Sequence, residues 1–75
     1  MDQQKDERII KEFGLNLKKL REQKNLSLRQ LADIADMNFG NIHEIEKGNV
    51  NPMLTTIVAL AEALQVTYPE LMGED

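Results

Sequence analysis

The chain has 75 residues and no cysteine, so it is one domain at most and contains neither a disulfide nor a thiolate metal site. Aromatic residues make up 4% of the sequence, so the core must consist of packed aliphatic side chains. The formal net charge is −4, but all nine Lys and Arg residues lie in residues 1–47, where they balance nine acidic residues, so a nucleic-acid partner is not excluded.

Apolar residues at helical spacing predict a first helix from about residue 7 to residue 24. Residues 1–6 are expected to form a flexible segment before it. Gly14 is a mild weakness inside this helix, and Asn25 is suited to the left-handed conformation that ends one. The apolar face of the helix is formed by Ile10, Phe13, Leu17 and Leu20.

Two short helices joined by a tight turn are predicted in residues 27–47. Ser27 is a favourable N-cap, and Gln30 three residues later completes a capping-box pattern. The segment Asp36-Met37-Asn38 is too short for anything but a turn. Asn38 can cap the second helix of the pair, and Gly48 can end it. The apolar faces of the two helices are Leu28, Leu31, Ala32 and Ala35, then Phe39, Ile42 and Ile45.

A loop and two further helices complete the predicted fold. The loop is Gly48-Asn49-Val50-Asn51-Pro52, and the fourth helix starts either with Asn51 as its cap or a few residues later. Thr67 or Tyr68 starts a last short turn. We therefore expect an all-α fold, a compact five-helix bundle that forms a single domain over residues 1–75. The apolar face of the fourth helix is Ile57, Leu60, Ala61 and Leu64.

The sequence argues against an enzyme and against a membrane protein. It contains no Ser/His/Asp or Cys/His set, no phosphate-cradling glycine loop, and no paired carboxylates beside a plausible pocket. No cofactor or metal is expected, since His43 is the single histidine. The longest apolar stretch, residues 53–61, is too short to span a bilayer, and residues 1–8 do not resemble a signal peptide. We expect a cytoplasmic protein.

Four motifs occur in order along the chain: Leu31-Ala32, Ile42-x-x-Ile45-Glu46-x-Gly48, Asn51-Pro52 and Ala61-x-Ala63-Leu64. In this combination, over about residues 13–72, the chain resembles the Cro/repressor-type (XRE-like) helix-turn-helix family. Within this family, the chain resembles restriction-modification controllers or phage repressors. The resemblance implies a lambda repressor-like bundle whose third helix, about residues 38–47, is a recognition helix that enters the major groove of duplex DNA.

The resemblance also implies roles for individual residues. It implies an ion pair between Arg21 and Glu46 that fixes the third helix. The base-reading positions it implies are Asn38, Phe39, Gly40 and Glu44, flanked by Asn41 and His43. The phosphate contacts are Lys18, Arg21, Leu28 at a helix N-terminus, Arg29, Asn41, Lys47, Asn49 and Asn51. The positive cluster that favours DNA is Lys18, Lys19, Arg29 and Lys47.

The chain departs from the family pattern at four positions. Leu28 replaces the usual Gln, and Asp36 replaces the usual Gly of the turn. Phe39 and Gly40 occupy positions that usually carry polar or basic side chains. Three interpretations of Phe39 stay open here: contact with a base, packing against the preceding helix, and contact with a protein partner. His43 is interpreted as a surface residue of the helix.

The predicted function is sequence-specific binding of an inverted-repeat operator by a homodimer that regulates transcription, most simply as a repressor or autoregulator, in a bacterium or phage-infected cell. The alternative is a protein-interaction module that keeps the fold, with Phe39 and Gly40 docking a partner. The apolar surplus late in the chain predicts the dimer interface, namely Val50, Met53, Leu54, Val58, Tyr68, Leu71 and Met72.

Overall fold

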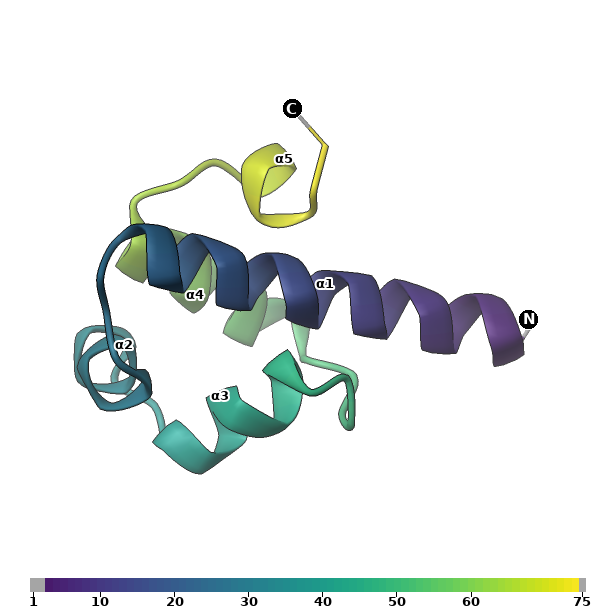
Figure 1. Cartoon of the computed structure of the whole chain (residues 1–75), viewed down its shortest axis with the longest axis horizontal. Coiled ribbons are helices and arrows are strands. Elements are labelled where there is room, and N and C mark those ends of the chain that lie inside the picture. The colour runs from purple at the N-terminus through teal and green to yellow at the C-terminus, as the bar shows by residue number, and fades with distance from the viewer. Residues whose placement is uncertain (1–2, 75) are drawn as a thin grey trace.

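The computed structural model describes residues 3–74, which form five helices and no strand (Figure 1). The helices are α1 (Gln3–Gln23), α2 (Leu28–Ala35), α3 (Phe39–Glu46), α4 (Leu54–Leu64) and α5 (Tyr68–Leu71). The expected all-α, five-helix fold is therefore confirmed. No helix in this part of the chain is both long and apolar enough to cross a lipid bilayer.

Local capping interactions set the boundaries of α2 and α3. The Ser27 hydroxyl accepts a hydrogen bond from the Gln30 N–H at 3.0 Å, and Gln30 Oε1 accepts one from the Ser27 N–H at 2.8 Å. These two bonds close the predicted capping box. Asn38 Oδ1 accepts the Gly40 N–H at 2.7 Å and caps α3. Asp36 adopts a left-handed φ of 56° at the end of α2, so the turn forms without the family's usual glycine.

The first helix begins earlier than its apolar pattern predicts. It starts at Gln3, so residues 3–6 are helical and are not the expected flexible segment, while residues 1–2 lie outside the described part of the chain. Gln3, Gln4 and Lys5 are good helix formers, and Asp6 places an acid in the first turn, where the helix dipole favours it. Gln3 Nε2 also donates to Glu7 Oε1 at 3.4 Å. Intrinsic propensity thus extends α1 past the core. Asn25, with φ of 59°, follows the end of the helix as predicted.

The fourth helix adopts the later of its two predicted starts, because Met53 and not Asn51 is its N-cap residue. The last helix is capped more strongly. Thr67 Oγ1 accepts the Glu70 N–H at 3.3 Å, and Glu70 Oε1 accepts the Thr67 N–H at 3.1 Å. The hydrogen bond from the Thr67 backbone, followed by the one from its side chain, lowers the pKa of Glu70.

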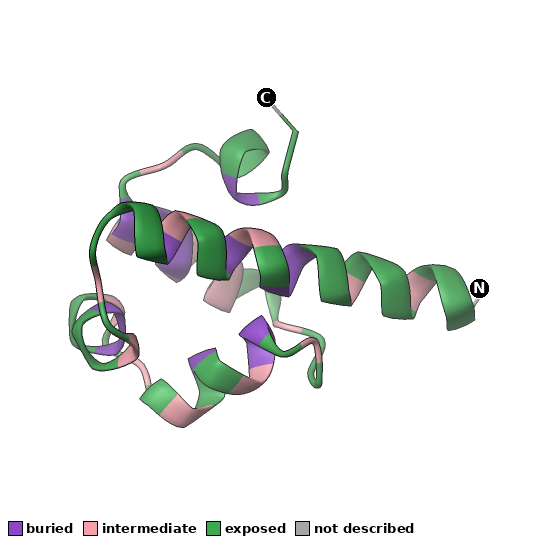
Figure 2. Cartoon of the chain, viewed as in Figure 1, coloured by how far each residue is buried: buried purple, intermediate pink, exposed green. Residues whose placement is uncertain are grey.

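The core is aliphatic, and every helix contributes to it. The C-terminal half of α1 packs against the other helices, whereas its N-terminal half extends beyond them with mostly exposed residues (Figure 2). Phe13 is the one aromatic side chain of this core, as the composition predicts. The buried hydrophobic residues are Phe13, Leu17, Leu31, Ala32, Ile42, Ile45, Leu60, Ala61, Leu64 and Leu71.

Gly14 lets the backbone of α3 lie directly on α1. A Cβ atom at this position would lie 2.3 Å from the carbonyl oxygen of Ile45 and 2.7 Å from that of Glu46. Both distances are far shorter than van der Waals contact. The glycine is therefore a packing requirement at the crossing of α1 and α3, where the sequence alone indicates only a mild local weakness.

Asn16 ties α5 to the middle of α1. Its side-chain Nδ2 donates to the carbonyl oxygen of Glu70 at 2.8 Å and to that of Leu71 at 2.6 Å. The Glu70 carbonyl also accepts the Gly73 N–H at 3.2 Å, so Asn16 adds a second partner there and supplies one to the Leu71 carbonyl at the helix end. A helix of four residues is held in place in this way.

Candidate nucleic-acid interface

A bidentate ion pair joins the C-terminal part of α1 to the end of α3. Arg21 Nε donates to Glu46 Oε2 at 2.6 Å, and Arg21 Nη2 donates to Glu46 Oε1 at 3.0 Å. The two residues are 8% and 6% exposed, so the predicted pair forms between nearly buried side chains. Two parallel bonds fix orientation as well as distance. The pair therefore holds α3 in one orientation relative to α1.

Arg21 has little surface left for a phosphate. Its third nitrogen, Nη1, donates to the carbonyl oxygen of Leu26 at 2.8 Å, so all three guanidinium nitrogens have partners inside the protein. The hydrogen bond with Glu46 raises the pKa of Arg21 against the opposing effect of burial. These contacts give Arg21 a structural role that links α1, the loop after it, and α3.

The start of α3 is the exposed tip of the helix-turn-helix. Asn38, Phe39 and Asn41 are exposed there, and Gly40 is half-buried. Asn38 uses its side-chain oxygen as the helix cap, which leaves its NH₂ group without a partner in residues 3–74. The Asn41 side chain likewise has no hydrogen-bond partner in the described residues. The tip therefore presents two unpaired amide NH₂ groups to the solvent.

Phe39 and Arg29 form a stacked pair that bridges α2 and α3. The guanidinium carbon of Arg29 lies 4.8 Å from the centroid of the Phe39 ring, a cation–π geometry. Phe39 is outside the hydrophobic core and is 44% exposed. Contact with α2 thus runs through the Arg29 side chain, and much of the ring remains available to DNA or to another partner.

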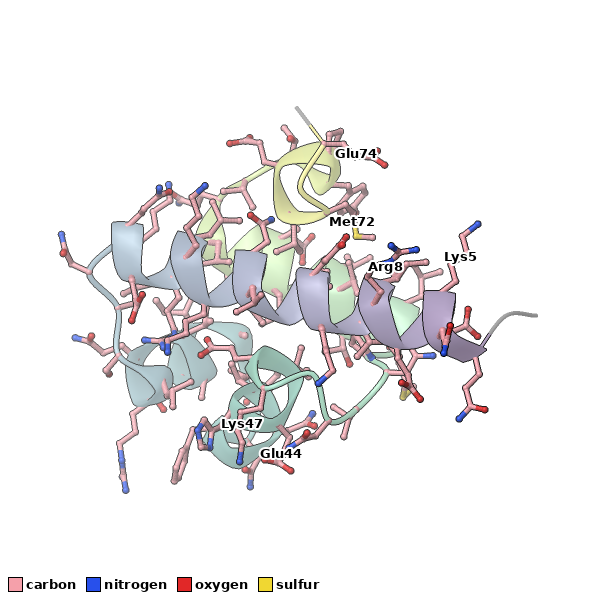
Figure 3. The ribbon with its side chains drawn as sticks, turned by 45° about the vertical axis from the view of Figure 1, so that its right-hand side comes forward. Lys5, Arg8, Glu44, Lys47, Met72 and Glu74 are labelled. Carbon is pink, nitrogen blue, oxygen red and sulfur yellow. The ribbon has the colours of Figure 1, made fainter. Side chains whose placement is uncertain are left out.

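Glu44 and Lys47 lie together near the C-terminal end of α3 (Figure 3). Lys47 Nζ is 3.8 Å from Glu44 Oε2, and Asn49 Nδ2 donates to Glu44 Oε1 at 3.5 Å. All three residues were predicted to face DNA. Exposed contacts of this length contribute about 1 kcal/mol or less, so they can open when a nucleic acid binds.

A basic hollow lies between α1 and α3, beside the Arg21–Glu46 pair. Its volume is about 430 Å³, and three lysines surround it. Lys18 and Lys47, both predicted phosphate contacts, come together here, and His43 lies with them. Lys11 joins this group although the sequence reasoning missed it. The residues that line the hollow are Lys11, Leu15, Lys18, His43, Glu46 and Lys47.

One predicted feature of the surface needs correction. Lys19 lines a separate hollow with Glu70 and Glu74, so it is not part of the positive cluster around Lys18. The positive surface next to α3 is therefore smaller than the sequence suggests. The Leu28 side chain packs against the core, which leaves its backbone N–H at the start of α2 as the group predicted to meet a phosphate. Asn51, the remaining predicted phosphate contact, is exposed on the loop after α3.

The predicted dimer surface is accessible except at one position. Leu71 is fully buried in the core of its own chain, so its place in the predicted interface was wrong. Met53 and Leu54, by contrast, are 69% and 76% exposed at the start of α4. The other members are the exposed Val50, Tyr68 and Met72 and the half-buried Val58.

Sequence reasoning missed three residues of α1 that shape the surface: Lys11, Gly14 and Asn16. Their partners lie on α3 and α5, up to 55 positions away for the Asn16 bond to Leu71, so no local pattern marks Gly14 or Asn16. Lys11 could have been found. It precedes Lys18 by seven residues, which places both on one face of a helix.

Known proteins resemble this chain in sequence. The family profile described as "Helix-turn-helix" matches residues 17–71. The HTH-type transcriptional repressor RghR of Bacillus subtilis is 39% identical over 64 residues, which are 84% of this chain and 47% of RghR. The control protein C.SmaI of Serratia marcescens is 35% identical over 57 residues, which are 76% of this chain and 68% of C.SmaI. The chain thus spans about half the length of RghR.

A solved structure shows the same likeness. The crystal structure of the restriction-modification controller protein C.AhdI from Aeromonas hydrophila has a TM-score of 0.80 against this chain, at 34% sequence identity. The match covers 83% of this chain and 94% of that one. The described arrangement of five helices is therefore one that a controller protein of similar size also adopts.

Proposed function

The chain belongs to the Cro/repressor-type (XRE-like) helix-turn-helix family, and on that premise we propose that it is a regulator of transcription that binds duplex DNA through α3. The observation that carries this proposal is the tip of α3. Asn38 and Asn41 carry side-chain NH₂ groups without a partner in residues 3–74, and Phe39 is exposed beside them. The other end of the helix is held by the buried Arg21–Glu46 pair. A rigidly held helix with an exposed polar tip is suited to reading base edges in the major groove.

The basic hollow supports the same proposal. Phosphates carry the negative charge of duplex DNA, and Lys11, Lys18 and Lys47 would neutralise them without reading sequence. These lysines flank α3, so they would hold its tip against the groove. Binding should therefore weaken steeply with salt. The net charge of −4 does not oppose this, because residues 48–75 carry four acidic residues and no Lys or Arg.

We further propose that the regulator is a homodimer. One recognition helix contacts few base pairs, so a monomer would bind weakly and discriminate poorly. The exposed apolar residues Val50, Met53 and Leu54 lie just after α3, where a second copy could cover them. The protein measures 34 × 27 × 20 Å. A two-fold dimer would have to place its two recognition helices about one DNA turn, ~34 Å, apart to enter successive major grooves.

Within this proposal the chain acts in the cytoplasm as a repressor or autoregulator, as the names of its relatives suggest, and it performs no catalysis. The test is selection of binding sites from a pool of random DNA duplexes at low and at moderate salt. Enrichment of an inverted repeat with half-sites about 10 base pairs apart would support a dimeric, sequence-reading regulator. Retention that disappears with salt and enriches no sequence would leave phosphate binding alone.

Two matched variants distinguish the reading of base edges from the neutralisation of phosphate charge. Lys18→Gln should lower affinity for every duplex by a similar factor and reduce the slope of log K against log salt by about 1. Asn41→Ala should change which sequence is preferred or weaken the preference. No retention of duplex at either salt would contradict the proposal, and it would favour the protein-interaction module.

A further inference from the structure

The Arg29–Phe39 stack joins the starts of α2 and α3 through two residues that are ten positions apart in sequence. Arg29 is the second residue of α2, and Phe39 is the first residue of α3. The 4.8 Å separation between guanidinium and ring centroid places the charge of Arg29 at the same tip that exposes Asn38. A cation contributed by α2 thus lies among the residues expected to read bases.

Helix electrostatics do not explain an arginine at this position. A helix carries partial positive charge at its N-terminus, so a cation in the first turn of α2 is disfavoured. The first turn of α2 contains no acidic residue to offset it. Asp33 lies one turn further along the same helix, at the spacing of a favourable pair, yet no ion pair joins it to Arg29 within residues 3–74.

The guanidinium donors of Arg29 are all unused in the described part of the chain. No hydrogen bond or ion pair occupies any of its five N–H groups, whereas all three nitrogens of Arg21 are occupied. Arginine donates through a planar fork, and stacking on a ring fixes the plane of that fork. A phosphate can accept the same fork, but it also binds a flexible lysine, so it requires no fixed plane. A guanine edge presents O6 and N7 side by side, and a fork held in a fixed plane can donate to both.

We propose that Arg29, held by the ring of Phe39, reads a guanine in the major groove of each half-site; this inference rests on the proposed function. It reassigns Arg29 from phosphate contact to base reading and makes Phe39 its positioning residue. Gly40 supports the assignment. A Cβ there would meet a single atom, Asn38 Oδ1 at 3.0 Å, so the next position on α3 offers open space and no side chain that could read the base.

If Arg29 bound a phosphate, it would duplicate the role proposed for the three lysines of the basic hollow. Lys11, Lys18 and Lys47 surround the hollow between α1 and α3, and each of them is a flexible point charge. None of them stacks on an aromatic ring in residues 3–74. The flexible lysines and the stacked Arg29 therefore suit different targets on DNA, phosphates for the lysines and a base edge for the arginine.

The test uses the duplex selected by the wild-type protein, together with versions in which each guanine of the half-site is replaced in turn. At one guanine, the wild type should lose roughly tenfold to a hundredfold in affinity, the range for a bidentate contact. Arg29→Lys keeps the charge and removes the fork, so its discrimination at that guanine should fall to threefold or less. Unchanged discrimination at every position in Arg29→Lys would overturn the inference.

Phe39→Leu tests the positioning role, since leucine keeps an apolar side chain but cannot hold the guanidinium plane. Phe39→Leu should reduce discrimination at the same guanine. The double variant, Arg29→Lys combined with Phe39→Leu, should discriminate at that guanine no worse than Arg29→Lys alone. Loss at a different base pair would overturn the positioning role. Thermal unfolding of each variant controls for folding, and Lys18→Gln is the comparison for a phosphate contact.

The outcomes separate the inference from the proposed function. A wild-type protein that selects no DNA sequence would contradict both the inference and the proposed function. A wild type that selects an operator, together with an Arg29→Gln variant that only reduces the salt slope by about 1, would retain the regulator and assign Arg29 to a phosphate.

Discussion

The substitution Gly14→Ala distinguishes the effect of helix propensity in α1 from the effect of the close packing of α3 on α1. Helix propensity alone predicts that alanine stabilises α1 by about 1 kcal/mol, because glycine is a poor helix former. The structure predicts the opposite. The added Cβ would lie 2.3 Å from the Ile45 carbonyl oxygen and 2.9 Å from the Glu46 carbonyl carbon, about 1 Å inside ordinary contact at the closer atom.

The loss of stability expected for Gly14→Ala follows from the kind of atom that the added Cβ meets. Both obstructing groups are backbone, so no side-chain rotation relieves the overlap, and α3 must move away from α1. Overpacking of this kind costs about 1–3 kcal/mol, and here the upper end applies. After the gain in helix propensity, we expect a net loss of about 2 kcal/mol. With a urea m-value of about 1 kcal/mol/M for a domain of this size, the midpoint should fall by ~2 M.

Urea unfolding followed by circular dichroism measures this directly, with Gly40→Ala as the matched control. A Cβ at Gly40 would meet one side-chain atom, Asn38 Oδ1 at 3.0 Å, which can shift by a few tenths of an ångström. That variant should stay within about 1 kcal/mol of wild type. A Gly14→Ala protein as stable as wild type, or more stable, would refute the close packing of α3 on α1.

Three further predictions follow from the contacts described above. Glu46→Gln leaves the charge of Arg21 without its carboxylate and should destabilise the protein by about 3 kcal/mol, whereas Arg21→Met combined with Glu46→Leu should recover most of the loss in urea unfolding. A double variant no more stable than Glu46→Gln would contradict this account of the pair. The lowered pKa of Glu70 means that its cap contributes fully above the ordinary glutamate pKa of about 4.3 and is lost as pH falls through the lower folded value. Glu70→Gln should therefore flatten the decline in thermal midpoint below about pH 4.5, and an unchanged decline would rule out the cap as its source. Leu54→Glu places an acid at the first position of α4, which that helix end tolerates, so it should leave the fold intact and dissociate the dimer in sedimentation at micromolar concentration. Ile34→Glu, on the exposed side of α2, is its control, and a dimer that survives Leu54→Glu would place the interface elsewhere.

Most helix boundaries of this protein are predictable from the sequence because the interactions that set them are local. The caps at Ser27, Asn38 and Thr67 each bind a backbone N–H two or three residues along the chain. Such contacts depend on few intervening torsions, so residue type and spacing determine them. The start of α1 was placed too late for a related reason. Hydrophobic periodicity marks the part of a helix that packs, and the polar turns before it follow propensity alone.

The Arg21–Glu46 pair spans 25 positions, and no local pattern predicts it. Resemblance to a family made it predictable, because the spacing of the motifs implies the fold and the fold brings the two side chains together. A different argument, the apolar surplus late in the chain, placed Leu71 in the predicted dimer interface. Its apolar character was read correctly, but whether an apolar side chain faces its own core or a partner depends on how α5 packs on α1.

The sequence by itself therefore determined the helices, their caps, the family, and the residues from which a DNA-binding surface would be drawn. The tertiary structure decided which of them share that surface. It brought Lys11 beside Lys18 and Lys47, separated Lys19 from them, and stacked Arg29 on the ring of Phe39. The physical reason is distance along the chain. A cap needs only its own turn, whereas a surface assembled from several helices depends on crossings set by side-chain volume, as at Gly14, where a single methyl group would shift α3.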